Sequence, residues 1–218
     1  MPHEEGMALH DAALAAGGVG GPLLEVGTYC GKSAVYLGSG AAEVGSVLYS
    51  IDHHRGSEEI QPGWPDHDHE VADEATGLMD TLPFARRTLA EAGLEDHVVL
   101  VVGRSATVAA HWCAPLALLF IDGGHGAAVA ADDFANWPPK LAPGGTLAVH
   151  DVFDDPAQGG QVPYRLYSQL LASGDFAEVG RVGSLRLARR AAGAGGAPGA
   201  GGGPATARRR RVAVELSV

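Results

Sequence analysis

Two aspartates at the ends of apolar segments are candidates for a shared metal ion. Asp122 ends the segment 116–122, and Asp151 ends the segment 144–151. If these segments are neighbouring strands of an open α/β sheet, both carboxylates lie at its carboxyl edge, where such sheets bind their ligands. Carboxylates completed by water and substrate oxygens suit Mg²⁺ or Mn²⁺. Aspartates at strand ends also cap following helices, so the residues alone leave a metal site and a structural role open.

A histidine stands close to each of these aspartates. His125 follows Asp122 by three residues, and His150 directly precedes Asp151. An imidazole titrates near neutral pH and therefore suits a general base. A histidine after a Gly-Gly turn is also often bonded to the backbone at the start of a helix, and this alternative stays open for His125.

A further candidate site lies in residues 23–38, which predict a buried strand, a tight glycine turn and a helix. The turn reads Gly27-x-x-x-Gly31, with Glu25 two residues before its first glycine and Tyr29 in its middle. The NAD-binding G-x-G-x-x-G turn needs its middle glycine to admit a pyrophosphate against bare backbone. A carboxylate beside the turn repels a diphosphate, whereas it suits a cofactor that carries an ammonium and a sulfonium, such as S-adenosylmethionine.

Asp52 ends the apolar segment 46–52, 25 residues after Gly27. In a doubly wound sheet this is where an acid accepts hydrogen bonds from both ribose hydroxyls of a nucleotide-type cofactor. A helix-capping aspartate is the alternative interpretation.

The elements that position these residues follow a repeating strand and helix pattern. Because the central apolar runs are continuous rather than alternating, we expect parallel strands covered by helices on both faces. After a helix-like stretch at 161–173, two short segments flank Gly183-Ser184 and predict an antiparallel hairpin. The predicted fold class is α/β, a Rossmann-like doubly wound sheet of seven mostly parallel strands with a C-terminal antiparallel hairpin. Its parallel strands are expected at 22–27, 46–52, 97–103, 116–122 and 144–151.

The chain of 218 residues fits one domain, which we expect to span residues 1–190. Residues 53–80 form a polar insertion, long enough to suggest a lid over the site. Residues 191–218 are rich in Gly, Ala and Pro and include four consecutive arginines. This composition cannot bury enough apolar surface to offset ordering entropy, so we expect a low-complexity, disordered tail.

The composition argues against several kinds of partner. With 26 acidic residues against 15 Lys and Arg, the net charge of −11 is unsuited to nucleic acid and favours a small-molecule substrate. The two cysteines, Cys30 and Cys113, suggest no disulfide framework and fit a reducing cytoplasm. Without an apolar run of about 18 residues, we expect no membrane span. The oligomeric state stays open, and a homodimer is compatible with the sequence.

The motifs together resemble those of class I S-adenosylmethionine-dependent methyltransferases. They comprise Glu-Val-Gly-Thr-Tyr-Cys-Gly-Lys-Ser, Ile-Asp52, Val-Gly-Arg-Ser105, Ile-Asp122-Gly-Gly-His125 and Ala-Val-His150-Asp151-Val. Within this superfamily the first motif is similar to that of the branch with catechol-type and bacterial natural-product O-methyltransferases. The resemblance covers about residues 20–190. It implies a set of cofactor-binding residues, namely Glu25, Gly27, Thr28, Tyr29, Gly31, Ser33, Asp52, His53, Ser105 and Asp122.

The resemblance also bears on the metal and on the base. In the catechol-type branch three acidic or amide groups from these strand ends bind the metal, and here they coincide with Asp122, His150 and Asp151. A histidine in this set favours Mn²⁺ or a softer ion, or else means that no metal binds. His125 matches the place where the branch keeps its general base, and His150 is the reserve candidate.

The sequence therefore predicts a methyltransferase that uses S-adenosylmethionine, most simply to methylate a hydroxyl group of a small molecule. Transfer to nitrogen stays open, as does assistance by Mg²⁺ or Mn²⁺. The alternatives are an NAD-dependent oxidoreductase, a metal-dependent hydrolase, and a cofactor-binding protein without catalytic activity.

Overall fold

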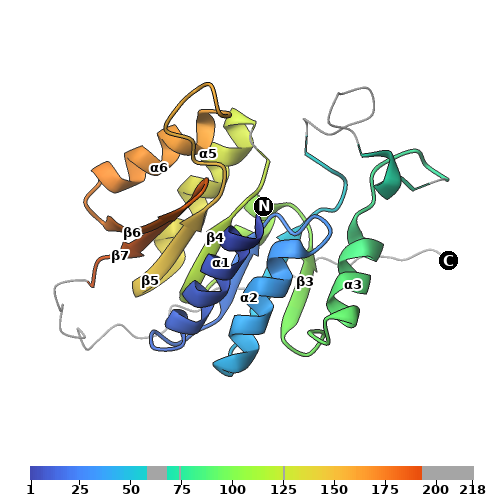
Figure 1. Ribbon diagram of the computed structural model, residues 1–218, viewed down its shortest axis with the longest axis horizontal. Helices are drawn as coiled ribbons and strands as arrows, with labels where there is room; N and C mark the ends of the chain where they lie inside the picture. Colours follow the sequence, from blue (N-terminus) through green and yellow to red (C-terminus); the bar gives the residue numbers. More distant parts are fainter. Residues whose placement is uncertain (58–67, 74, 125, 193–218) are drawn as a thin grey trace, which may run out of the picture.

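In the computed structural model, the described part of the chain comprises residues 1–57, 68–73, 75–124 and 126–192 (Figure 1). Within it, seven strands form one sheet in the order β3-β2-β1-β4-β5-β7-β6. Their bounds are β1 Leu23–Val26, β2 Leu48–Asp52, β3 Val98–Val102, β4 Leu116–Ile121, β5 Leu141–Val149, β6 Phe176–Val182 and β7 Leu185–Arg190.

Strands β1 to β5 pair in parallel, and β7 pairs antiparallel with both β5 and β6. The predicted fold class is thereby confirmed, including the C-terminal hairpin. Strand β5 begins three residues earlier than expected, because Leu141 pairs with Leu116 across an irregularity before the regular register at Leu118 and Thr146. The carboxyl ends of β1, β2, β4 and β5 all meet at one edge of the sheet, and this edge carries the site.

Two hydrophobic clusters cover the two faces of the sheet. Successive strand residues point to opposite faces, so Leu23 belongs to the cluster under the first helices and Leu24 to the other. The first face is covered by α1 His3–Ala16, α2 Lys32–Glu43 and α3 Leu82–Glu91. The second is covered by α4 Ser105–Ala109, α5 Ala127–Asn136, the short η3 Pro138–Lys140, and α6 Val162–Ala172.

Helix α1 was not anticipated by the strand and helix repeat. It lies beside α2 across the sheet, as Figure 1 shows, and its buried residues include Leu9, Ala12 and Ala13. Its first turn reaches the carboxyl edge of the sheet, where Glu5 is buried. The N-terminal residues therefore belong to the body of the domain.

The described parts of the 53–80 insertion include the short helix η2 His69–Val71 and a bridge between Ala72 and Met79. Residues 58–67 and 74 lie outside the described residues, so the lid stays a prediction. The predicted tail also lies outside them from residue 193 onward. Among the described helices, none combines the length and the apolar character that a bilayer crossing requires.

Candidate functional site

The glycine turn connects β1 to α2 and lies directly against the end of β4. Gly27 has a φ of 100°, and a side-chain Cβ there would overlap the carbonyl oxygen of Asp122. Gly31, with a φ of 89°, precedes the first turn of α2. Glycine is required at Gly27 both by its backbone conformation and by this close approach. The turn and Asp122 therefore form one continuous surface.

Glu25 lies on β1 beneath this turn and has no exposed surface. One carboxylate oxygen, Oε2, accepts a hydrogen bond from Ser50 Oγ, whereas Oε1 has no hydrogen-bond partner among the described residues. Burial raises the pKa of Glu25 to about 7, although the hydroxyls of Ser33 and Ser50 favour its charged form. Thr28 completes this buried group, with its Oγ1 2.6 Å from Ser50 Oγ.

Asp52 lies at the end of β2, beside the glycine turn. Its Oδ2 accepts a hydrogen bond from the backbone N–H of Tyr29 at 2.8 Å, and its Oδ1 accepts one from the N–H of His54 at 2.8 Å. These bonds orient the carboxylate and leave each oxygen with further accepting capacity. The geometry suits an acid that accepts hydrogen bonds from two ligand hydroxyls.

The insertion touches the turn through Tyr29, whose hydroxyl donates to Asp68 at 2.8 Å. Tyr29 itself has a φ of 48° and is 41% exposed. His53 is exposed, and its Nδ1 accepts a hydrogen bond from the N–H of Arg55. Ser33 is buried in the first turn of α2. Cofactor contacts of these residues stay predictions.

Ser105, expected near the cofactor base, is engaged within the protein. Its hydroxyl donates to Asp133 at 2.5 Å and accepts from Trp137 Nε1 at 2.6 Å. Burial raises the pKa of Asp133 to about 6 despite the bond from Ser105. The side chain of Ser105 thus ties α4 to α5, and its contact with a cofactor stays a prediction.

Asp122, His150 and Asp151 meet at the ends of β4 and β5, as the strand order predicts. One donor atom from each residue lies within 4.8 Å of the others. His150 Nδ1 is 3.1 Å from Asp122 Oδ1 and 3.2 Å from Asp151 Oδ1. Neither contact has hydrogen-bond geometry, so this buried nitrogen has no hydrogen-bond partner among the described residues. We call these three residues the edge cluster.

The charge of His150 follows from its neighbours. Burial alone would lower the pKa of His150, but Asp122 and Asp151 outweigh it and raise the pKa to about 11. An imidazole that is already protonated cannot accept another proton. The arrangement therefore does not suit the general base for which His150 was the reserve candidate, and Nδ1 would have to lose its proton before it could bind a metal ion.

Glu5 joins the edge cluster although its sequence position does not predict this. Its Oε2 lies 2.8 Å from His150 Nε2, and the two residues are 2% and 8% exposed. Burial would raise the pKa of Glu5, but hydrogen bonds from His150 and Ser184 lower it below its usual value. In the sequence Glu5 is one acid in the first turn of a helix, a pattern that is usual for solvated residues and gives no local signal. His125, the first candidate for the base, lies outside the described residues.

Comparison with protein families gives one match over the same region. A methyltransferase domain family matches residues 24–152, which run from β1 through the glycine turn and Asp52 to the edge cluster. The match covers more than half of the chain.

Solved structures with a similar fold include several O-methyltransferases. The O-methyltransferase NovP is 17% identical with a TM-score of 0.65, over 86% of this chain and 80% of that chain. An O-methyltransferase from Bacillus cereus in complex with SAH is 19% identical with a TM-score of 0.60, over 87% and 82%. CalS11, a calicheamicin methyltransferase, is 14% identical with a TM-score of 0.59, over 85% and 77%. At these identities the likeness shows a common fold.

Proposed function

The chain belongs to the methyltransferase domain family, and on this basis we propose that it transfers a methyl group from S-adenosylmethionine to a hydroxyl group of a small molecule. The observation that carries the proposal is the contact of the Gly27 turn with Asp122. It brings the residues expected to hold the cofactor next to those expected to hold the acceptor. The family match favours this function over an oxidoreductase or a hydrolase.

The cofactor would lie across the glycine turn, with Asp52 accepting hydrogen bonds from its ribose. The carboxylates of Asp52 and Asp122 place negative charge beside the turn, which favours a cofactor that carries an ammonium and a sulfonium, and such a cofactor would in turn favour the charged form of Glu25. Because Glu25 has no exposed surface, it would act through its charge rather than by direct contact. S-adenosylmethionine supplies the methyl group, and the protein supplies the alignment that brings the acceptor oxygen to about 3 Å from it.

The edge cluster fits a divalent cation. His150 Nδ1 is a buried nitrogen without a hydrogen-bond partner among the described residues, and it faces two carboxylate oxygens. With Glu5 included, three carboxylates surround one imidazole, so the group keeps a net negative charge even when His150 is protonated. Mixed nitrogen and oxygen ligands favour Mn²⁺ or a softer ion over Mg²⁺. Such an ion would polarise the acceptor hydroxyl and lower its pKa.

Deprotonation of the acceptor is assigned to His125, on the residue types alone. Asp122 and Asp151 would hold the acceptor and its ion at the mouth of the sheet, while His150 provides positive charge or ligation between them. CalS11, a calicheamicin methyltransferase of similar fold, supports a small acceptor for this chain as well. The same proposal assigns residues 1–190 to the catalytic domain.

Calorimetric titration of the full chain with S-adenosylhomocysteine, and separately with NAD, tests the cofactor. Micromolar affinity for S-adenosylhomocysteine alone is the expected result, and binding of NAD in its place would refute the proposal. A panel of phenols, sugars, hydroxylated natural products and small amines, assayed with S-adenosylmethionine with and without Mn²⁺, then identifies the acceptor. Transfer only to amines would contradict the assignment to oxygen.

A further inference from the structure

Glu5 contacts the imidazole of His150 at the ring nitrogen that does not face the aspartates. Its Oε2 is 2.8 Å from Nε2, whereas Nδ1 lies near Asp122 and Asp151. Both members of the Glu5–His150 pair are almost fully buried. The ring is therefore held between a carboxylate on one side and the edge cluster's two aspartates on the other.

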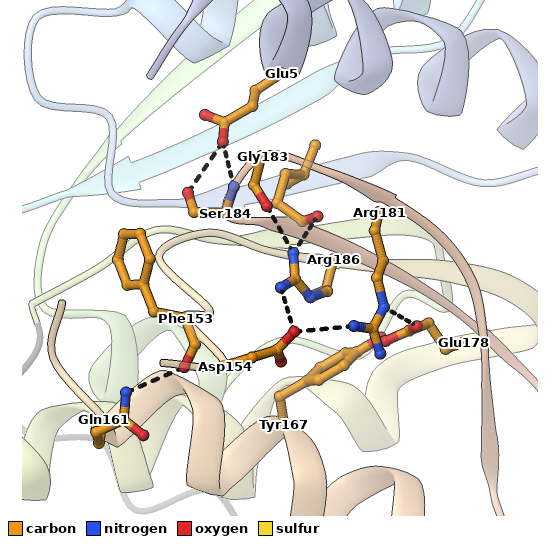
Figure 2. Close-up of polar contacts among 11 residues, drawn as sticks. Glu5, Phe153, Asp154, Gln161, Tyr167, Glu178, Arg181, Gly183, Ser184 and Arg186 are labelled. Carbon is orange, nitrogen blue, oxygen red and sulfur yellow. Dashed lines mark hydrogen bonds and ion pairs between the residues drawn. The ribbon is translucent and has the colours of Figure 1, made fainter. Parts of the chain in front are cut away.

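The hairpin turn between β6 and β7 fixes the carboxylate of Glu5. Its Oε1 accepts hydrogen bonds from the backbone N–H of Ser184 at 2.6 Å and from the Ser184 hydroxyl at 3.0 Å (Figure 2). Gly183 has a φ of 54°, and a Cβ there would overlap Glu5 Oε1. The glycine thus leaves room for the carboxylate, and both of its oxygens are committed.

The turn is itself held from its other side. Arg186 donates to the carbonyl of Gly183 at 2.8 Å and forms an ion pair with Asp154 at 3.4 Å, as Figure 2 shows. Helix α1 is anchored in turn, because Lys32 Nζ donates to the carbonyl of Met1 at 2.7 Å. Glu5 is consequently placed by two rigid elements, a condition for holding another side chain in one orientation.

We propose that Glu5 is a positioning residue for the divalent cation of the edge cluster. By accepting the Nε2–H of His150, it holds the ring so that Nδ1 points toward Asp122 and Asp151, where a bound cation would take the place of the Nδ1 proton. A carboxylate that accepts from the non-ligating nitrogen fixes ring orientation and raises the basicity of the ligating one. This inference rests on the proposed metal site and assigns a role to the N-terminal helix in building it.

In the variant Glu5→Gln, the amide oxygen and the amide NH₂ can each replace only one of the two carboxylate oxygens, so the orientation of the side chain can be predicted. Ser184 presents a backbone N–H that can only donate, so the amide oxygen takes the place of Oε1. The amide NH₂ then faces His150 Nε2 and favours the tautomer with its proton on Nδ1. That proton would occupy the direction in which the cation binds.

Manganese binding to the full chain tests the inference, with S-adenosylhomocysteine present. Mn²⁺ affinity of Glu5→Gln is expected to fall about 10–100-fold, while its affinity for S-adenosylhomocysteine stays within twofold of the wild type. The matched control is Glu4→Gln on the exposed side of the same helix turn, which removes the same charge and should leave Mn²⁺ affinity within twofold. In a His150→Ala background, Glu5→Gln should cause no further loss.

A spectroscopic readout separates positioning from general loss of structure. Long-range ¹H–¹⁵N NMR correlations of the wild type loaded with Zn²⁺, a diamagnetic and softer ion, should show His150 protonated at Nε2 alone, and Glu5→Gln should shift the proton toward Nδ1. If Glu5→Gln does not fold, Glu5→Asp keeps the charge on a shorter side chain and should show a smaller loss of Mn²⁺ affinity.

Two results would overturn the inference. One is Mn²⁺ affinity in folded Glu5→Gln within twofold of the wild type. The other is a wild type that binds S-adenosylhomocysteine but no Mn²⁺, which removes the metal site and leaves the cofactor site standing. Failure to bind S-adenosylhomocysteine would instead contradict the proposed function itself.

Discussion

Replacing Glu25 with glutamine would keep the shape of a fully buried side chain and remove its ability to ionise. In the folded protein the pKa of Glu25 is raised from 4.5 to about 7, and its first cause is burial. In the unfolded chain the same carboxyl is exposed to water. The two states therefore bind different numbers of protons between about pH 4.5 and pH 7.

The sign and size of the effect follow from this difference. Below pH 4.5 both states hold the proton of Glu25, and the wild type keeps its full stability. As the pH rises toward 7, the unfolded state loses this proton first, so the free energy of unfolding falls. At about 1.36 kcal/mol per pKa unit, the loss for this shift reaches about 3 kcal/mol above pH 7. Glutamine does not titrate, so Glu25→Gln should gain about 2.5 kcal/mol relative to the wild type between about pH 5 and pH 8.

Urea unfolding of both proteins at several pH values from 5 to 8, followed by circular dichroism, measures this difference. Titrations elsewhere in the chain affect both proteins and cancel when their free energies are subtracted. Asp133→Asn is a matched control, because burial raises the pKa of Asp133 only to about 6. Its difference curve should change between about pH 4 and pH 6 and be flat above.

A difference between wild type and Glu25→Gln that stays constant within about 0.5 kcal/mol from pH 5 to pH 8 would refute the reasoning. So would a difference of opposite sign, because it would mean that the folded protein stabilises the charged carboxylate. In that case a cation or an ordered hydrogen bond at Oε1 must offset its burial.

Three further predictions concern the same edge of the sheet. Gly27→Ala should destabilise the fold by about 3 kcal/mol or more, measured by urea unfolding, whereas Gly45→Ala, with a φ of 67° but nothing within 4 Å of its Cβ, should cost only about 1 kcal/mol. Equal losses would mean that the contact with Asp122 is unimportant. Asp52→Ala should weaken binding of S-adenosylhomocysteine in calorimetry by about 10-fold or more, through loss of charge-assisted hydrogen bonds, and unchanged affinity would remove the ribose assignment. His125→Ala should lower kcat and leave S-adenosylhomocysteine affinity intact, and an unchanged pH profile of kcat would exclude it as the base.

The architecture could be predicted because its signals are local. Continuous apolar segments such as 116–122 mark strands covered on both faces, and Gly183-Ser184 between two short segments marks a hairpin. The order of the strands then brings Asp122 and Asp151 together without further information. The start of β5 was predicted less well, because Leu141 joins the sheet across an irregularity that its local sequence does not signal.

The site was predicted less completely because some of its contacts join distant parts of the chain. Glu5 and His150 are 145 positions apart, and nothing around Glu5 distinguishes it from an acid in the first turn of an exposed helix. Ser105 was predicted as a site residue, but its contacts within the protein were not. Its place after β3 favours a cofactor contact, but its hydroxyl bonds to Asp133 and Trp137, whose positions depend on the packing of α5.

Glu5 and Glu25 are two buried carboxylates of one sheet edge whose pKa values shift in opposite directions. Glu25 has hydroxyl partners only, so burial dominates and raises its pKa. Glu5 faces an imidazole and a backbone N–H, which outweigh burial and lower its pKa. A positive charge near Glu25 would lower its pKa in the same way. A cationic cofactor on the turn above Glu25 would supply that charge, and a divalent cation at Asp122 and Asp151 would balance the remaining acids. The excess of negative charge along this edge therefore fits the two proposed sites, one for a cationic cofactor and one for a divalent cation.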